Sequence, residues 1–190
     1  MAPNPERRAR LLDAAIEVLG AAGVGGLTHR AVDDKADEPA GTTSNYFRTR
    51  SALLEATAQR IVEVQWQYVG TLQDSLGTLT RDTLAAMMTT MVSDLAGVNG
   101  RRQLARYELF NEGVRRPELR PMIAEMQSGA MRFARIILEK AGLEPTDEQV
   151  GELARLLNGL AYSNLTFAAD QPGRADPAGL IERMLATVFG

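Results

Sequence analysis

A run of small polar side chains lies at residues 38–50, EPAGTTSNYFRTR, and almost none of them could build a core. Gly41 would let the chain pass close to a sugar-phosphate backbone. The side chains suited to base edges or phosphates are three hydroxyls and an amide: Thr42, Thr43, Ser44 and Asn45. A phenol and two guanidinium groups suited to phosphates follow: Tyr46, Arg48 and Arg50. These residue types predict contact with a nucleic acid.

Two short helices around a tight turn would position these side chains. We predict one helix at about 28–35, capped by Thr28, and a second at about 39–46, with Pro39 in its first turn. Braced by an apolar first helix, they form a helix-turn-helix, whose second short helix enters the DNA major groove. The residues that open the preceding helix could meet a phosphate through free N–H groups: Thr28, His29 and Arg30.

Helical periodicity continues through the rest of the chain. Thr49 can cap a long fourth helix. Longer helices are expected at about 79–96, 99–113, 117–142, 146–169 and 175–189. No segment alternates with period two over the length of a strand, so the predicted fold class is all-α. The composition shifts near residue 47, which indicates a small N-terminal module joined by a continuous helix to a larger bundle.

Composition excludes several classes of function. The chain has no cysteine and one histidine, so thiolate chemistry and disulfides are excluded, and no second histidine exists to share a metal. His29 is either a phosphate-facing residue or an ordinary surface residue. No glycine-rich phosphate loop or metal motif is present, so we expect no enzyme activity, cofactor or metal. No apolar run approaches the roughly 20 residues of a membrane span, so a cytoplasmic protein is expected.

Two stretches, AAGVGGLTHRAV and ADEPAGTTSNYFRTRSALLEA, resemble the DNA-binding domain of TetR-type (tetracycline-repressor-like) regulators. The similarity runs from about Arg8 to Ala56, and ARYELFNEGVRRPELRP is similar to the middle of the ligand-binding domain in some members. The resemblance implies a DNA-binding domain at 5–65, with its helix-turn-helix at about 28–46, and a helical ligand-binding and dimerisation domain at 66–190. The implied function is a bacterial ligand-responsive repressor, a homodimer that leaves a palindromic operator when a small molecule binds.

The resemblance also assigns roles to single residues. It implies backbone contacts for one set: Thr28, Gly41, Thr42, Tyr46 and Arg50. It implies groove-facing positions for a second set: Thr43, Ser44 and Asn45. Phe47 would pin the recognition helix to the first helix.

The bundle offers candidates for a ligand pocket and a dimer interface. Aromatic, amide and methionine side chains could line an apolar cavity, although methionines are more often core: Trp66, Met87, Met91, Tyr107, Asn111, Met126, Asn158 and Tyr162. An apolar stripe on the last two helices reads as core in isolation and as the dimer's four-helix bundle under the resemblance: Leu153, Leu157, Leu160, Ala161, Leu165, Met184 and Val188.

Acidic residues in the module depart from the family pattern. Residues 1–50 hold six Arg and one Lys against seven Asp and Glu, a net charge of zero. Asp33 and Asp34 add acid to the second helix, while Asp37 and Glu38 stand where the family has a glycine and an apolar residue. Since cations meeting phosphates supply much of DNA affinity, we expect weakened binding. The alternative function is a small-molecule-binding helical dimer that has weakened or lost DNA binding.

Overall fold

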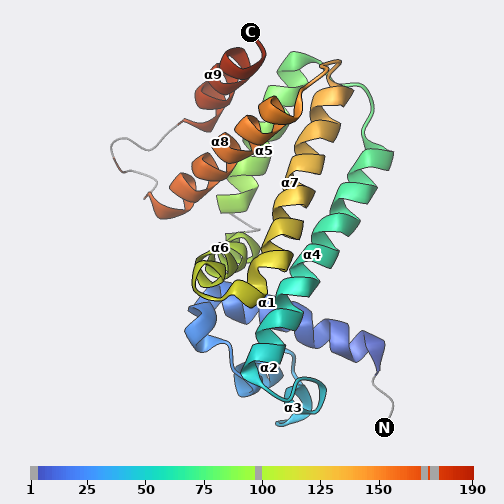
Figure 1. The fold of residues 1–190 in the computed structure, drawn as a ribbon, viewed down its shortest axis with the longest axis vertical. Coiled ribbons are helices and arrows are strands. Elements are labelled where there is room, and N and C mark those ends of the chain that lie inside the picture. The colour runs from blue at the N-terminus through green and yellow to red at the C-terminus, as the bar shows by residue number, and fades with distance from the viewer. Residues whose placement is uncertain (1–3, 97–99, 168–170, 172–175) are drawn as a thin grey trace. The chain divides into compact units, whose positions relative to one another are not determined.

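The computed structural model describes residues 4–96, 100–167, 171 and 176–190. Every regular element in these ranges is a helix, which confirms the all-α prediction (Figure 1). The elements are α1 (Pro5–Gly26), α2 (His29–Lys35), α3 (Thr42–Tyr46), α4 (Arg50–Ser75), α5 (Arg81–Ala96), α6 (Gly100–Arg115), the 3-10 helix η1 (Pro117–Leu119), α7 (Arg120–Lys140), α8 (Asp147–Thr166) and α9 (Pro177–Phe189). Within these ranges no helix is both long enough and apolar enough to cross a bilayer.

The chain divides into two compact units. Unit 1 consists of Met1–Trp66 and Arg101–Met126, and unit 2 consists of Gln67–Gly100 and Gln127–Gly190. The first break, inside α4, lies next to the predicted boundary at residue 65. Most of α6 and the first residues of α7 belong to unit 1, whereas the sequence predicts that the whole of 66–190 forms one domain.

The helix ends of unit 1 are set by local capping side chains. Asn4 accepts hydrogen bonds from the N–H groups of Glu6 and Arg7 at 3.0 and 3.2 Å, and Pro5 fills the first helical position, where its missing N–H costs nothing. Thr28 caps α2 by accepting from the Ala31 N–H at 3.1 Å. Thr49 does the same for Ala52 at 3.1 Å, so both predicted threonine caps are confirmed.

The core of unit 1 gathers the apolar stripes of α1, α4 and α6. Fully buried residues of these helices include Leu11, Leu19, Leu53 and Leu109. Each such leucine contributes roughly 1.5–3 kcal/mol by leaving water. Phe47, which the resemblance places in the core, is 4% exposed and belongs to the same cluster. This core holds the N-terminal helices α1, α2 and α3 against α4 (Figure 1).

Helix α3 is shorter than the sequence predicts. It begins at Thr42 and not at Pro39, because Gly41 adopts a left-handed backbone with φ of 89° and serves as the N-cap. Pro39 lies in the preceding turn, where its carbonyl accepts from the Thr42 N–H at 3.0 Å. Gly41 has no side chain with which to cap α3, so an acceptor must come from elsewhere in the fold.

Unit 2 is a helical cluster in which α5, α8 and α9 contact one another (Figure 1). Its core is built on buried leucines, isoleucines and methionines, among them Leu84, Ile137, Leu153 and Ile181. Helix α8 begins with a reciprocal capping box between Thr146 and Gln149. The expected ends of the last two helices at 169 and 175 lie outside the described residues.

Candidate nucleic-acid interface

Asp33 of α2 supplies the acceptor that α3 lacks. Its side chain is 1% exposed, and its two oxygens accept from the Gly41 N–H at 2.8 Å and the Thr43 N–H at 2.7 Å. The Thr43 hydroxyl also donates to it, at 2.5 Å. A carboxylate at a helix N-terminus is stabilised by the N–H groups that point at it. Asp33 therefore fixes the angle at which α3 leaves the turn.

The role of Asp33 is missing from the sequence prediction, which counts it only as acid in the module. Two features of the sequence could have indicated it. Gly41 cannot cap a helix with a side chain, and Asp33 lies close before it in the same motif. The partners that bury the carboxylate are set by tertiary structure, so the sequence pattern alone does not reveal them.

The hydroxyls of α3 divide into inward and outward groups. Thr43 is fully buried, and its hydroxyl points inward to Asp33. Its side chain is therefore not presented to a groove, contrary to the sequence expectation. Thr42 is 9% exposed, and its hydroxyl donates to the Pro39 carbonyl at 2.6 Å. Asn45 is exposed, whereas Ser44 and Tyr46 are half-buried. The outer surface of α3 therefore offers one amide, one hydroxyl and one phenol.

The acidic turn between α2 and α3 is an ordered part of the fold. Asp37 has a left-handed backbone with φ of 53°, a conformation in which aspartate is enriched among residues other than glycine. The Glu38 side chain is only 7% exposed and forms ion pairs with Arg7 and Arg10, the latter at 3.2 Å. The Arg7 Nε also donates to it, at 2.9 Å. Glu38 therefore ties the turn to the start of α1, and the turn is not loosened by a carboxylate in an apolar slot.

The Glu38 contact should make stability depend on pH. Hydrogen bonds from Arg7, followed by those from Arg10 and the charges of both residues, lower the pKa of Glu38 below its ordinary value of 4.5, against the opposing effect of burial. Because the folded-state pKa is lowered, the contribution is present above 4.5 and is lost as the pH falls through the lower folded value.

We expect Glu38→Gln to lower the thermal midpoint at neutral pH and to lose less stability than the wild type on acidification below about 4.5. Thermal unfolding followed at several pH values checks this. Glu6→Gln is the matched control, because Glu6 is an exposed acid on the same helix as Arg7. Parallel pH curves for the wild type and Glu38→Gln would contradict the assignment.

Arg50 is exposed, but its guanidinium is hydrogen-bonded to backbone carbonyls of unit 1. Its Nε donates to the Leu27 carbonyl at 3.0 Å, and its Nη2 donates to the carbonyls of Val24 and of Gly25, the second at 3.2 Å. The guanidinium therefore holds the connection between α1 and α2. This use of its donors differs from the phosphate contact that the resemblance implies.

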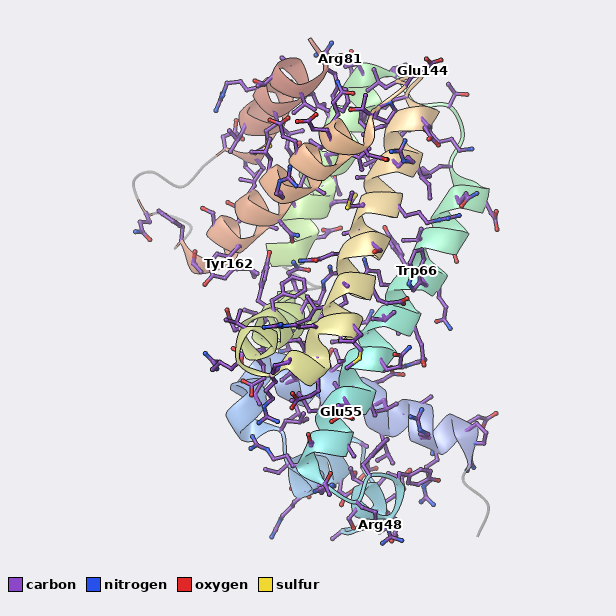
Figure 2. The ribbon with its side chains drawn as sticks, viewed as in Figure 1. Arg48, Glu55, Trp66, Arg81, Glu144 and Tyr162 are labelled. Atoms are coloured by element: carbon purple, nitrogen blue, oxygen red, sulfur yellow. The ribbon has the colours of Figure 1, made fainter. Side chains whose placement is uncertain are left out.

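Other predicted contact residues remain outward or join the module's elements. Arg30 is exposed, with its Nε 3.9 Å from Asp34, and Arg48 projects from the chain beside α3 (Figure 2). Thr28 and Gly41 are also exposed. The His29 Nε2 donates to the Phe47 carbonyl at 2.6 Å, so this histidine joins α2 to the end of α3. The predicted arginines are thus all exposed, and Arg50 among them is hydrogen-bonded to backbone carbonyls.

Helix α6 holds the α1–α2 connection from another direction. The Glu108 Oε2 accepts from the Val24 N–H at 3.2 Å, beside the break in α1 at Gly23, where φ is 66°. One turn earlier in α1, Gly20 lies against the backbone of Arg101. Residues 23–27 are therefore bound both by α4, through Arg50, and by α6, through Glu108.

The predicted ligand residues are distributed over both units. Met126 is fully buried in the core of unit 1, and Trp66 and Tyr107 of the same unit are half-buried, whereas Asn111 is exposed. In unit 2, Met87, Met91 and Asn158 are half-buried. Tyr162 is 50% exposed on α8 (Figure 2). A hollow of unit 2 beside Arg81, Leu84 and Phe189 includes none of these predicted residues.

Most of the predicted dimer stripe is buried within the single chain. Five of its seven residues are at most 9% exposed: Leu153, Leu160, Ala161, Met184 and Val188. They pack in the interior of unit 2 because a stripe at helical spacing faces the nearest core. Leu157 and Leu165 are half-buried on α8, which also presents Gly159 and Tyr162 at its surface.

No group of three or more potential metal-binding side chains occurs in the part of the chain that the structure describes. The arrangement around α2 and α3 instead suits recognition by hydrogen bonds and charge. A buried carboxylate fixes a short helix whose outer surface carries an amide, and Arg48 extends into solvent just after it. Phosphate contacts by exposed cations position such a helix, while an amide can read base edges.

Comparisons with known proteins agree with this arrangement. Residues 79–188 match the family model for the tetracyclin repressor-like C-terminal domain. The HTH-type transcriptional regulator BetI of Paraburkholderia xenovorans is 27% identical over 114 residues, which are 60% of this chain and 58% of BetI. BetI of Paraburkholderia phytofirmans is 36% identical over 61 residues, 32% of this chain and 31% of BetI. The chain thus spans less than two thirds of these relatives.

Solved structures of similar proteins cover nearly the whole chain. A TetR-family member from Streptomyces coelicolor A3 is 28% identical with a TM-score of 0.66, covering 95% of this chain and 98% of that one. The multidrug binding protein EbrR complexed with ethidium is 28% identical with a TM-score of 0.64, and the match covers 98% of this chain and 99% of EbrR. The matched C-terminal model spans more than half of the chain, and the helix-turn-helix precedes it. The chain belongs to the TetR (tetracycline-repressor-like) family of transcriptional regulators.

Proposed function

We propose that this regulator is a repressor that binds a palindromic operator as a homodimer and releases it when a small molecule binds. The observation that carries the proposal is the fixed start of α3: Asp33 sets the helix while Asn45 and Arg48 stay exposed. Two such modules in a dimer would address half-sites about 34–36 Å apart. The name of EbrR, a multidrug binding protein, supports a small-molecule effector for the similar fold.

The acidic residues of the module offer less repulsion to DNA than their number suggests. Asp33 is buried in hydrogen bonds to α3, and Glu38 is neutralised by Arg7 and Arg10. Asp34 and Asp37 are the two acids of this segment that remain exposed. The alternative function, a ligand-binding dimer without an operator, rested on this acidic segment, so the internal pairing favours DNA binding.

The route from ligand to operator would run through α6. This helix holds the Val24 N–H through Glu108, and the same connection is held by Arg50 at the start of α4. An effector that binds one arrangement of α6 more tightly would shift the position of residues 24–27, and with them α2. Ligand and operator would then favour different populations of the dimer, which is a reciprocal coupling.

Operator binding at varied salt tests the proposal. DNA from the upstream intergenic region should be bound with a steep loss of affinity as salt rises. We expect Arg30→Ala and Arg48→Ala each to weaken binding and to reduce the slope of log affinity against log salt by about 0.9 for each phosphate that the protein no longer neutralises. Fluorescence anisotropy with labelled DNA measures both.

Arg81→Ala removes the same charge from an exposed position in unit 2 and should leave the slope unchanged. Arg50→Ala is a separate case, because that residue holds the α1–α2 connection and its loss would perturb the fold. Shallow salt dependence in the wild type, with no preferred sequence in a genome-derived pool, would contradict the proposal and restore the alternative.

A further inference from the structure

Arg106 of α6 is a half-buried cation that has no part in the proposed DNA contacts. Its Nε is shielded from solvent and has no hydrogen-bond partner in the structure. Burial lowers the pKa of Arg106 below its usual range, against an opposing effect of Tyr107. The group still carries its charge at neutral pH, because an arginine keeps its proton in proteins. A shielded Nε donor without an acceptor destabilises a fold, so its presence needs an explanation.

The face of α6 around Arg106 has the chemistry of a site for an aromatic ligand. Its guanidinium carbon lies 5.9 Å from the centre of the Phe110 ring, and Tyr107 meets that ring edge-on at 6.2 Å. Gln103, one turn earlier, is 4% exposed. The four residues follow the i, i+3, i+4, i+7 spacing of one helix face. They combine two aromatic rings, one amide and one cation whose Nε is free to donate.

The opposite face of α6 holds the DNA-binding module. Ala105 and Leu109 are fully buried in the core of unit 1, and Glu108 binds the Val24 N–H. One face of α6 therefore packs against the DNA-binding module, and the opposite face contains the unpaired Nε of Arg106. A ligand bound to the opposite face would act on the helix that holds residues 23–27.

We propose that the face of α6 formed by Gln103, Arg106, Tyr107 and Phe110 binds an aromatic or amphiphilic anion, with Arg106 receiving its carboxylate or sulfonate. This names the class of effector and rests on the proposed function for its regulatory consequence. An arginine matches a carboxylate with parallel N–H donors, and such charge-assisted bonds are the strong ones. A bound anion would also remove the cost of the unpaired charge, so the free protein is prepared for this class of ligand.

A matched pair of fluorescent probes isolates the charge. The anion 8-anilinonaphthalene-1-sulfonate and the neutral N-phenyl-1-naphthylamine share their aromatic skeleton and differ in the sulfonate. The quantity measured is the ratio of their dissociation constants in each variant, so that general apolar binding cancels. We expect Arg106→Met to shift this ratio against the anion by about tenfold or more, the usual value of a charge-assisted hydrogen bond. Arg102→Gln, at an exposed position one turn earlier on α6, should leave the ratio as in the wild type.

Stability provides the second readout. If Arg106 is kept for a ligand, Arg106→Met removes an uncompensated charge, and urea unfolding of the free protein should show equal or greater stability. A ratio that is the same in the wild type and Arg106→Met would overturn the proposal. Strong destabilisation or failure of Arg106→Met to fold would overturn it too, since the cation would then be a structural partner of Phe110.

Operator binding separates this proposal from the proposed function. If both hold, the anionic probe should weaken operator binding by the wild type and by Arg102→Gln, and should have little effect on Arg106→Met. A wild type that never binds an operator but shows the charge-dependent ratio would refute the repressor and leave the anion site standing. A wild type that binds its operator, but whose ratio of probe dissociation constants does not depend on Arg106, would support the repressor and refute the anion site.

Discussion

Asp33→Ala should lower the free energy of unfolding by about 3 kcal/mol and abolish operator binding. The substitution leaves the N–H groups of Gly41 and Thr43 without their acceptor. These groups lie in the interior, where Asp33 is only 1% exposed. An unsatisfied buried donor costs about 1–3 kcal/mol, and the Thr43 hydroxyl loses its partner as well. Urea unfolding measures the stability, and anisotropy with operator DNA measures the binding.

Asp34→Ala is the matched control for Asp33→Ala. Asp34 is the next residue on α2, its side chain is 72% exposed, and its nearest cation is Arg30 at 3.9 Å. A surface substitution of this kind changes stability by no more than about 0.5 kcal/mol. If the two alanine variants proved equally stable, the buried hydrogen bonds of Asp33 would not be what fixes α3.

Asp33→Asn separates the loss of charge from the loss of the side chain. The amide has the same shape and keeps one oxygen acceptor, but its NH₂ group meets the donors of Gly41 or Thr43. We expect a smaller loss of stability than with alanine and faster amide exchange at Thr43, because one hydrogen bond at the start of α3 cannot form. Operator binding should weaken in proportion to that local opening.

Features that depend on neighbours in sequence were predicted well. The caps at Thr28 and Thr49 require only a hydroxyl and the N–H three residues later, and both are present. The all-helical class follows from apolar spacing, and the core position of Phe47 follows from the family pattern. Each of these rests on a short-range geometric rule or on a close motif match.

Features that depend on distant partners were not predictable. The sequence pattern places Glu38 at a position that is apolar in the family. It does not reveal the partner Arg7, which lies on α1, 31 residues away. The sequence pattern also does not reveal the bonds from Arg50 to the Leu27 and Gly25 carbonyls, because these partners are tertiary neighbours. Thr43 reads as groove-facing because hydroxyl type does not reveal which side of a short helix meets a buried carboxylate.

The apolar stripe of α8 shows a different limit. Apolar residues at helical spacing identify a face that leaves water, but they do not identify what covers it. Leu153 and Leu160 are covered by the chain's own core, whereas Leu157 remains half-buried on the same helix. The interpretation of the stripe as core is therefore correct for its buried residues. Its assignment to a dimer interface needs a measurement of oligomeric state.

Gly20→Ala should destabilise the protein by about 2 kcal/mol, although alanine is ordinarily the better helix former. A Cβ at this position would lie 1.9 Å from the Arg101 carbonyl oxygen and 2.7 Å from its carbon, and backbone atoms cannot rotate away. Overpacking of this kind costs about 1–3 kcal/mol or more, which exceeds the roughly 1 kcal/mol that alanine gains over glycine in a helix. Helices α1 and α6 would have to separate within unit 1.

The separation should also reach the DNA-binding module, because the Glu108 bond to the Val24 N–H is already 3.2 Å long and joins the same two helices. We therefore expect Gly20→Ala to weaken operator binding beyond its effect on stability. Gly70→Ala is the matched control: a Cβ added to Gly70, inside α4, would have no neighbouring atom within 4 Å, so the substitution should raise stability by up to about 1 kcal/mol. Urea unfolding of both variants measures whether the free energy of unfolding falls for Gly20→Ala and rises for Gly70→Ala. A Gly20→Ala protein as stable as Gly70→Ala would mean that α6 does not press on α1, and the route from an effector on α6 to the operator would lack its first step.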